Sequence, residues 1–118
     1  MKLTGSSLKT RTSTTAALLI GLSLPADAQL TNVQVIALNG GRVIGAAAAC
    51  RLDNDRVKGV GVQLLTAISE RSRSRTERER ATEIYIDASA LGASQVRAGR
   101  VPCRDARAAL NELEKQLK

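Results

Sequence analysis

The sequence predicts a small all-α domain, a bundle of three to four antiparallel helices stapled by one disulfide, after a cleaved N-terminal signal peptide. First, apolar residues recur at steps of three and four over most of the chain. Second, Tyr85 is the only aromatic residue, so the core must be built from Leu, Ile, Val and Ala, which suits closely packed helices. Third, the only two cysteines, Cys50 and Cys103, allow one intramolecular bridge.

Residues 1–28 have the three parts of a secretory signal peptide. These parts are a basic start with Lys2, Lys9 and Arg11, an apolar run from Ala16 to Leu24, and a cleavage motif, Ala26-Asp27-Ala28. The apolar run is much shorter than the roughly 20 residues that a membrane-spanning helix needs. We therefore expect a mature domain of residues 29–118, without a transmembrane segment, in the periplasm or secreted.

Export changes what the cysteines imply, because the compartment is oxidising and a small domain gains much from a covalent link. Cys50 and Cys103 lie 53 positions apart, and closing a loop of that length contributes about 4 kcal/mol in the unfolded-state entropy model. No C-x-x-C spacing lowers a thiol pKa here, so we expect a structural bridge and no reactive thiol.

The first segment of the mature chain fits two structures. From Thr31 to Cys50, apolar and small residues have helical spacing, with Thr31 or Asn32 as the N-cap. Residues 33–38, Asn39-Gly40 and residues 42–44 also fit a β-hairpin with an Asn-Gly turn. An isolated hairpin is marginal in water, so the helix is favoured, although a kink at the glycines stays open.

A second helix is predicted from Asp53 to about Ser69, because Asp53-Asn54-Asp55 supplies capping side chains before an apolar stripe. That stripe consists of Val57, Val60, Gly61, Leu64, Leu65 and Ile68. Gly59 and Gly61 lower helix propensity, and a close contact with another backbone would compensate. We expect that contact to be with the small residues Ala46 to Ala49.

A third helix is predicted from about Glu77 to Ala98, started by a Thr76 and Glu79 capping box and ended by Gly99 as the C′ residue. Its expected apolar side consists of Ala81, Ile84, Tyr85, Ala88, Leu91, Gln95 and Val96. Pro102 then favours a helix start that places Cys103 in the opening turn of the last helix. The apolar face of this last helix consists of Ala106, Ala109, Leu110, Leu113 and Leu117.

Composition argues against most catalytic sites. The chain has no histidine, which removes Ser-His and Cys-His pairs and the common zinc sites. Asp53 and Asp55 fit helix caps, and the carboxylates of Glu77, Glu79 and Glu83 fit surface ion pairs with nearby arginines. We therefore expect no enzyme, no metal and no cofactor.

The chain is basic, with a net charge of +7, which falls to +5 when Lys2, Lys9, Arg11 and Asp27 leave with the signal. With one aromatic residue for base stacking, and with export, we expect no nucleic-acid partner. The candidate site for an anion or a partner is the arginine segment, which consists of Arg71, Arg73, Arg75, Arg78 and Arg80. The competing interpretation is a solvated turn neutralised by neighbouring glutamates.

The sequence favours a non-enzymatic, periplasmic helical interaction protein, such as an inhibitor, adaptor or stress chaperone. In size, export, helicity and its single Cys50–Cys103 bridge, the chain is similar to the small two-cysteine periplasmic acid-stress chaperones. That resemblance assigns no site residue. The charge of the chain supports it, because protonated carboxylates in acid leave a charge near +15, and self-repulsion would then open the helices and expose their apolar stripes.

Two alternatives stay open. A basic surface-binding protein would dock on anionic envelope lipid or polysaccharide through residues 71–80, with steep salt dependence. The partner would then be an envelope component and not another periplasmic protein. A small helical enzyme is the other alternative, because Leu52-Asp53, Leu64-Leu65 and Arg71 resemble the first helix of the small helical chorismate mutases. The remaining charged residues of that family are not matched.

Overall fold

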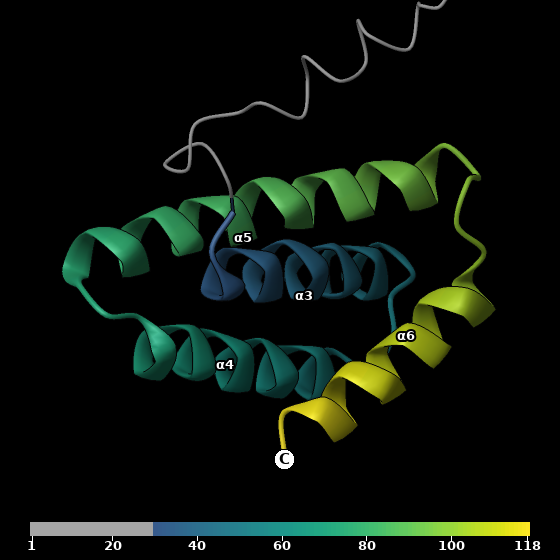
Figure 1. The fold of residues 1–118 in the computed structure, drawn as a ribbon. Coiled ribbons are helices and arrows are strands. Elements are labelled where there is room, and N and C mark those ends of the chain that lie inside the picture. The colour runs from purple at the N-terminus through teal and green to yellow at the C-terminus, as the bar shows by residue number, and fades with distance from the viewer. Residues whose placement is uncertain (1–29) are drawn as a thin grey trace, which may run out of the picture. The chain divides into compact units, whose positions relative to one another are not determined.

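The structure, a computed structural model, describes residues 30–118, so the expected signal peptide at residues 1–28 lies outside the described residues. The described range is all-helical, as predicted, and contains no strand (Figure 1). Its four helices are α3 (Asn32–Ala49), α4 (Asn54–Arg71), α5 (Arg75–Arg97) and α6 (Cys103–Gln116).

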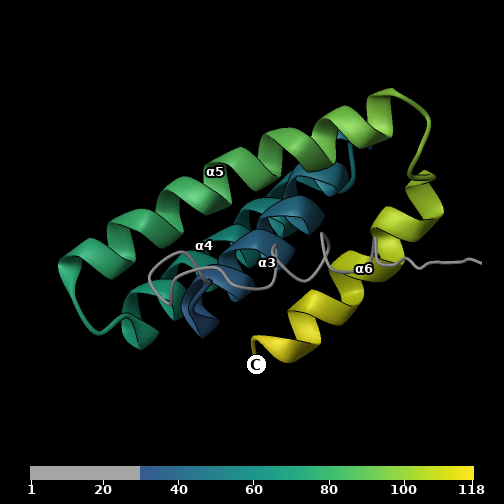
Figure 2. The same ribbon diagram turned by 45° about the horizontal axis from the view of Figure 1, so that its top comes forward.

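α3 is the central helix of the bundle, because it packs against each of the other three (Figure 1). α3, α4 and α5 alternate in direction along the chain, so the closely packed α3 and α5 run parallel to each other. α6 lies inclined to these three helices and contacts α3 and α4 (Figure 2). The antiparallel prediction therefore holds for α3 with α4 and for α4 with α5, but not for the closest pair, α3 and α5, or for the inclined α6.

The choice between helix and hairpin is decided in favour of the helix, since α3 continues without a break through Asn39-Gly40-Gly41. Its start is a capping box, in which the Gln34 N–H donates to Thr31 Oγ1 at 3.2 Å and the Thr31 N–H donates to Gln34 Oε1 at 3.1 Å. Gly40 and Gly41 are buried against the side chain of Leu64 and against α5. These tertiary contacts offset the low helix propensity of glycine.

The closest helix contact joins α3 and α5 through glycines. A Cβ on Gly45 would collide with the carbonyl group of Ser89, and a Cβ on Gly92 would collide with the carbonyl group of Arg42. One turn before Gly45, a Cβ on Gly41 would lie 2.7 Å from the carbonyl oxygen of Tyr85. Three small residues thus bring the two backbones into direct contact.

The predicted glycine contact of α4 was wrong. Gly59 faces open space, and a Cβ on Gly61 would meet only the Tyr85 hydroxyl, at 3.4 Å. Within residues 46–49, only Ala46 and Ala47 are buried. α4 instead approaches α3 with its large Leu64, which fills the space above Gly40, so the small residue in this contact lies on α3 and not on α4.

The larger apolar side chains come mainly from α4 and α6 and pack around α3. The buried cluster consists of Val33, Ala37, Ile44, Ala47, Val57, Val60, Leu64, Ile68, Ala81, Leu110 and Leu113. Two leucines of the predicted apolar faces are exposed, since Leu65 is 38% exposed and Leu91 is 46% exposed. In α5 the residue buried beside Leu91 is Gly92, since the approach of α3 leaves room for no side chain there.

Cys50 and Cys103 are paired at disulfide distance, with their Cα atoms 5.6 Å apart. Cys50 is the C-cap of α3 and Cys103 is the first residue of α6, so the pair ties the end of α3 to the start of α6 as predicted. The chain leaves α3 through Arg51, which has a φ of 56°. In this Schellman motif, the Arg51 N–H donates to the Ala48 carbonyl and the Leu52 N–H to the Ala47 carbonyl.

The ends of α4 and α5 agree with the sequence predictions, with one exception. Asp53 caps α4, and Gly99 has a φ of 76° after α5, as expected. The Thr76 capping box was wrong, because α5 begins two residues earlier, with the Ser74 hydroxyl accepting from the Glu77 N–H at 3.1 Å. The Glu77 carboxylate accepts from the Arg73 N–H, so this S-x-x-E motif fixes the turn as well as the helix start.

Candidate functional site

An open groove, which was not identified from the sequence, runs between α3 and α6. It consists of two adjoining depressions, of about 420 Å³ and 330 Å³, which share Asn39, Val43 and Ala109. We refer to it as the α3/α6 groove. Its two helical sides consist of Ile36, Asn39, Gly40, Val43 and Ala46 from α3 and Ala106, Ala109, Leu113, Gln116 and Leu117 from α6.

The groove follows from the spacing of these residues. On each helix they recur at steps of about three and four, which places them on one side. Leu110 and Leu113 anchor α6 in the core, while Ala106 and Ala109 face the groove with side chains too short to fill it. The floor is therefore apolar and shallow, with Val43 and Ala109 half-buried at its centre.

Charged side chains line both depressions of the groove. Arg42 and Arg100 line the larger depression with Asp105, and Arg71 lines the smaller one with Glu112. Asp105 lies 3.7 Å from the guanidinium of Arg104, whereas Arg42, Arg100 and Arg71 form no ion pair within residues 30–118. Three guanidinium groups are thus left for an anionic partner.

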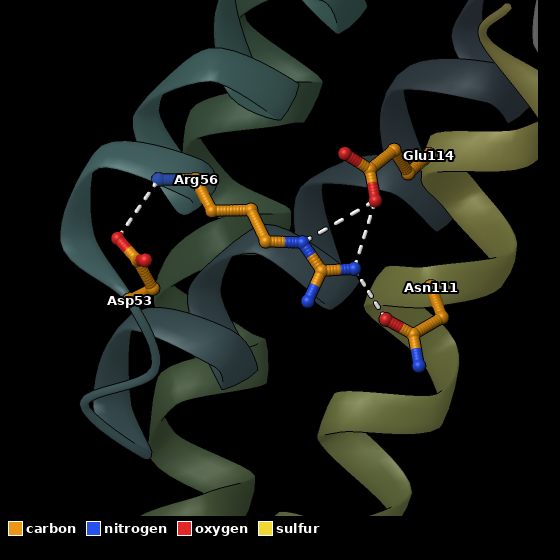
Figure 3. A network of polar contacts seen from close by, with 4 residues as sticks. All are labelled: Asp53, Arg56, Asn111 and Glu114. Atoms are coloured by element: carbon orange, nitrogen blue, oxygen red, sulfur yellow. Dashed lines mark hydrogen bonds and ion pairs between the residues drawn. The ribbon is translucent and has the colours of Figure 1, made fainter.

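A polar cluster holds α6 in place on the side of α4 (Figure 3). The Arg56 guanidinium donates to Glu114 Oε1 from Nη2 at 2.8 Å and from Nε at 3.3 Å, and Nη2 also donates to Asn111 Oδ1. The backbone N–H of Arg56 donates to Asp53 Oδ1 at 3.2 Å, so the same residue closes the α4 cap.

The Arg56 cluster and the disulfide act on opposite ends of α6. Cys103 is its first residue, and Glu114 lies in its last turn. The Arg56 and Glu114 side chains are 35% and 32% exposed, so water weakens their attraction and the cluster serves mainly to orient α6. With both ends attached, α6 keeps its distance from α3 and the groove keeps its width.

The predicted arginine segment is only partly one surface. All five of its side chains are exposed, but Arg71 ends α4 and lines the groove, whereas Arg73, Arg75, Arg78 and Arg80 lie on the turn and on α5. Arg75 pairs with Glu79 at 3.6 Å. Arg80 stands about 140° around the helix axis from Arg75, at 100° per residue, so these two residues point to different sides.

Of the acidic residues singled out in the sequence, Asp53 has the predicted capping role, because it accepts hydrogen bonds from the Asp55 and Arg56 N–H groups. Glu79 forms a predicted surface ion pair, with Arg75. Glu77 instead accepts a hydrogen bond from the backbone N–H of Arg73. Within residues 30–118, no group of three His, Cys, Asp or Glu residues is placed to hold a metal ion. No helix in this range is long and apolar enough to cross a bilayer.

Sequence reasoning missed Arg42, Arg100 and Asn39 as site residues. Arg42 and Asn39 sit within α3, where each reads as an ordinary polar position, and Arg100 follows the helix-ending Gly99. One signal was present, since Ala106 and Ala109 are small residues on a face that otherwise carries leucines. Small residues on an apolar face indicate either a close contact or an unfilled groove, and only the structure distinguishes the two.

No protein-family model, curated protein or solved structure matches the chain. Neither family resemblance drawn from the sequence therefore receives support from these comparisons.

Proposed function

We propose that the chain is a non-enzymatic, exported interaction protein that binds another protein in the α3/α6 groove. The observation that carries the proposal is the groove itself, whose apolar floor is open along one side and whose two depressions are each lined by arginines without an ion-pair partner in residues 30–118. A floor of this kind stays exposed to water in the free protein, and covering it is favourable in proportion to the apolar area buried. The open side suits a segment of another chain.

Two further features support export and a rigid binding surface. The paired Cys50 and Cys103 fit an oxidising compartment, where a small domain relies on such a link. The attachment of α6 at both ends keeps the groove formed in the absence of a partner, which lowers the entropy cost of binding.

The test is affinity capture from periplasmic extract with the tagged mature protein, at neutral and at acidic pH. Ala109→Glu places a carboxylate on the groove floor, and Ala108→Glu makes the same change on the exposed side of α6. One stoichiometric protein, captured at neutral pH by wild type and by Ala108→Glu but not by Ala109→Glu, supports the proposal. Capture that is equal for both variants contradicts it, and many proteins captured only in acid would indicate a chaperone.

Docking on anionic envelope lipid or polysaccharide is the second candidate, favoured by a separate observation. Arg73, Arg78 and Arg80 are exposed and make no ion pair in the described part of the chain. Binding to anionic vesicles that falls steeply with salt, and is lost when these three residues are changed to glutamine, would support it. Salt-independent binding, or none, would contradict it.

Catalysis is the least supported alternative. The groove holds Asp105 and Glu112 as its only acidic groups, and the chain contributes no histidine. An activity there would depend on these two carboxylates and would be abolished by Asp105→Asn or Glu112→Gln.

A further inference from the structure

We infer that the occupant of the α3/α6 groove is an amphipathic helix of about three turns, with acidic side chains at both of its ends, contributed by another protein. The inference rests on the proposed function and specifies the chemistry of the partner. Three properties of the groove carry it: its length, the shape of its floor and the placement of its charges.

The length of the groove fits a short helix. Its lining on α3 extends from Ile36 to Ala46, which spans about 15 Å at 1.5 Å per residue. A partner helix of about ten residues covers the same distance in three turns. The α6 side, from Ala106 to Leu117, has a matching length, so a helix of this size laid in the groove would contact both α3 and α6.

The floor favours a helix because it is formed by two helices. Ridges of side chains on α3 and α6 leave a shallow channel between them, and a third helix packs into such a channel with its own ridges. Val43 and Ala109 lie at the centre, where both depressions meet. The occupant therefore needs apolar side chains at positions i, i+3 or i+4, and i+7, the pattern of a helix that binds in a groove.

The charges favour a partner with carboxylates. Arg42 and Arg100 line the larger depression and Arg71 lines the smaller one, and these guanidinium groups lack ion-pair partners within the described range. Guanidinium binds carboxylate through two parallel hydrogen bonds, which selects glutamate and aspartate over neutral side chains. Of the two acidic groups at the rim, Asp105 already faces Arg104 at 3.7 Å, so Glu112 alone would oppose an acidic partner.

Polar side chains at the edge of the groove also suit an amphipathic helix. Asn39, Gln95 and Gln116 line the depressions and carry amide groups that donate and accept hydrogen bonds. They suit the polar flank of an amphipathic helix, which lies next to its apolar side. A lipid tail would leave these amides without partners.

The experiment uses synthetic peptides of about 14 residues, with leucines at helical spacing, glutamates at both ends and one tryptophan as reporter. The mature protein contains no tryptophan, so the fluorescence signal comes from the peptide alone. Two control peptides carry lysines in place of the glutamates, or the same residues with the leucine spacing scrambled. Affinity is measured by fluorescence anisotropy, and helix formation by circular dichroism.

We expect the acidic peptide to bind about tenfold more tightly than the lysine peptide, because lysines meet like charges in both depressions of the groove. Ala109→Glu should abolish the binding, and Ala108→Glu should leave it unchanged. Arg42→Gln with Arg100→Gln should weaken it by about tenfold through loss of two charged contacts. Arg78→Gln with Arg80→Gln removes the same charge outside the groove and should alter it by less than about twofold. Circular dichroism confirms that each variant is folded.

Equal affinity for the acidic and lysine peptides would overturn the charge assignment, and equal affinity for the scrambled peptide would overturn the helical occupant. If no peptide binds while the capture experiment still depends on Ala109, the inference fails and the proposed function stands. If capture does not depend on Ala109, the proposed function itself fails.

Discussion

Gly45 in α3 lies directly against the backbone carbonyl of Ser89 in α5, with no space for a Cβ between them. A second contact of the same kind joins the two helices, where Gly92 in α5 lies against the backbone carbonyl of Arg42 in α3. Two parallel helices thus meet backbone to backbone, while the large apolar side chains of α4 and α6 pack elsewhere on α3. This contact places α3 and leaves its other side free to form the groove.

A methyl group at Gly45 should therefore destabilise the protein severely. Gly45→Ala forces α5 away from α3, and overpacking of this kind costs about 3 kcal/mol. Gly59→Ala is the matched control, because Gly59 is also helical but faces open space. It should stabilise the fold by about 0.5–1 kcal/mol through higher helix propensity. Chemical denaturation measures both, and equal effects of the two changes would contradict the close contact.

Arg51→Gly should stabilise the protein. Arg51 has a φ of 56°, a conformation that costs a residue with a Cβ about 1–2 kcal/mol and costs glycine little. Because glycine also loses more entropy on folding, the expected net gain is about 0.5–1 kcal/mol in the free energy of unfolding. Arg51→Ala removes the charge but keeps the strain. A gain in stability in both variants would therefore show that loss of the charge, and not relief of the strain, is the cause.

Removing the link between Cys50 and Cys103 should lower the free energy of unfolding by about 4 kcal/mol, given the 53-residue separation of the two cysteines. The comparison is between oxidised wild type and Cys50→Ser with Cys103→Ser, measured by thermal and urea unfolding. Reduced wild type should behave like the double variant. Unchanged stability after reduction would show that the bridge is not closed in the mature protein.

The ion pair between Arg56 and Glu114 should contribute only modestly to the free energy of unfolding. A double-mutant cycle with Arg56→Ala and Glu114→Ala should give a coupling free energy of about 0.5–1 kcal/mol, because both side chains are about one-third exposed. Arg56→Ala alone should cost more than Glu114→Ala, since it also removes the packing of the arginine stem and the bond to Asn111. A coupling near zero in low salt would show that the disulfide and the core alone position α6.

Much of the fold was predictable because local signals and tertiary packing agree. Asp53 as a cap, Gly99 at a positive φ and Cys103 in the first turn of α6 each follow from chemistry within a few residues. The Thr76 cap failed because Ser74 offers an equivalent S-x-x-E motif two residues earlier. Two overlapping motifs of similar strength cannot be ranked from sequence alone.

The helix pairing and the site were harder to predict, because both depend on contacts between distant residues. Gly41 and Gly45 have the four-residue spacing of a close-packing face, but the sequence does not say which helix meets it. Gly59 is also a glycine within a helix, but it is exposed and no other helix lies close to it. The arginine segment could be recognised because its arginines lie close together in the sequence. Arg42 and Arg100 could not, because they lie far apart in the sequence and line the same groove from separate elements.

Photo-cross-linking in cells would show whether the α3/α6 groove holds a protein partner. A photoreactive amino acid is placed at position 109, on the groove floor, or at position 108, on the exposed side of the same helix. We expect one dominant cross-linked protein from position 109 and none from position 108. The same products from both positions, or products only from a third probe at position 78 in the arginine segment, would contradict it.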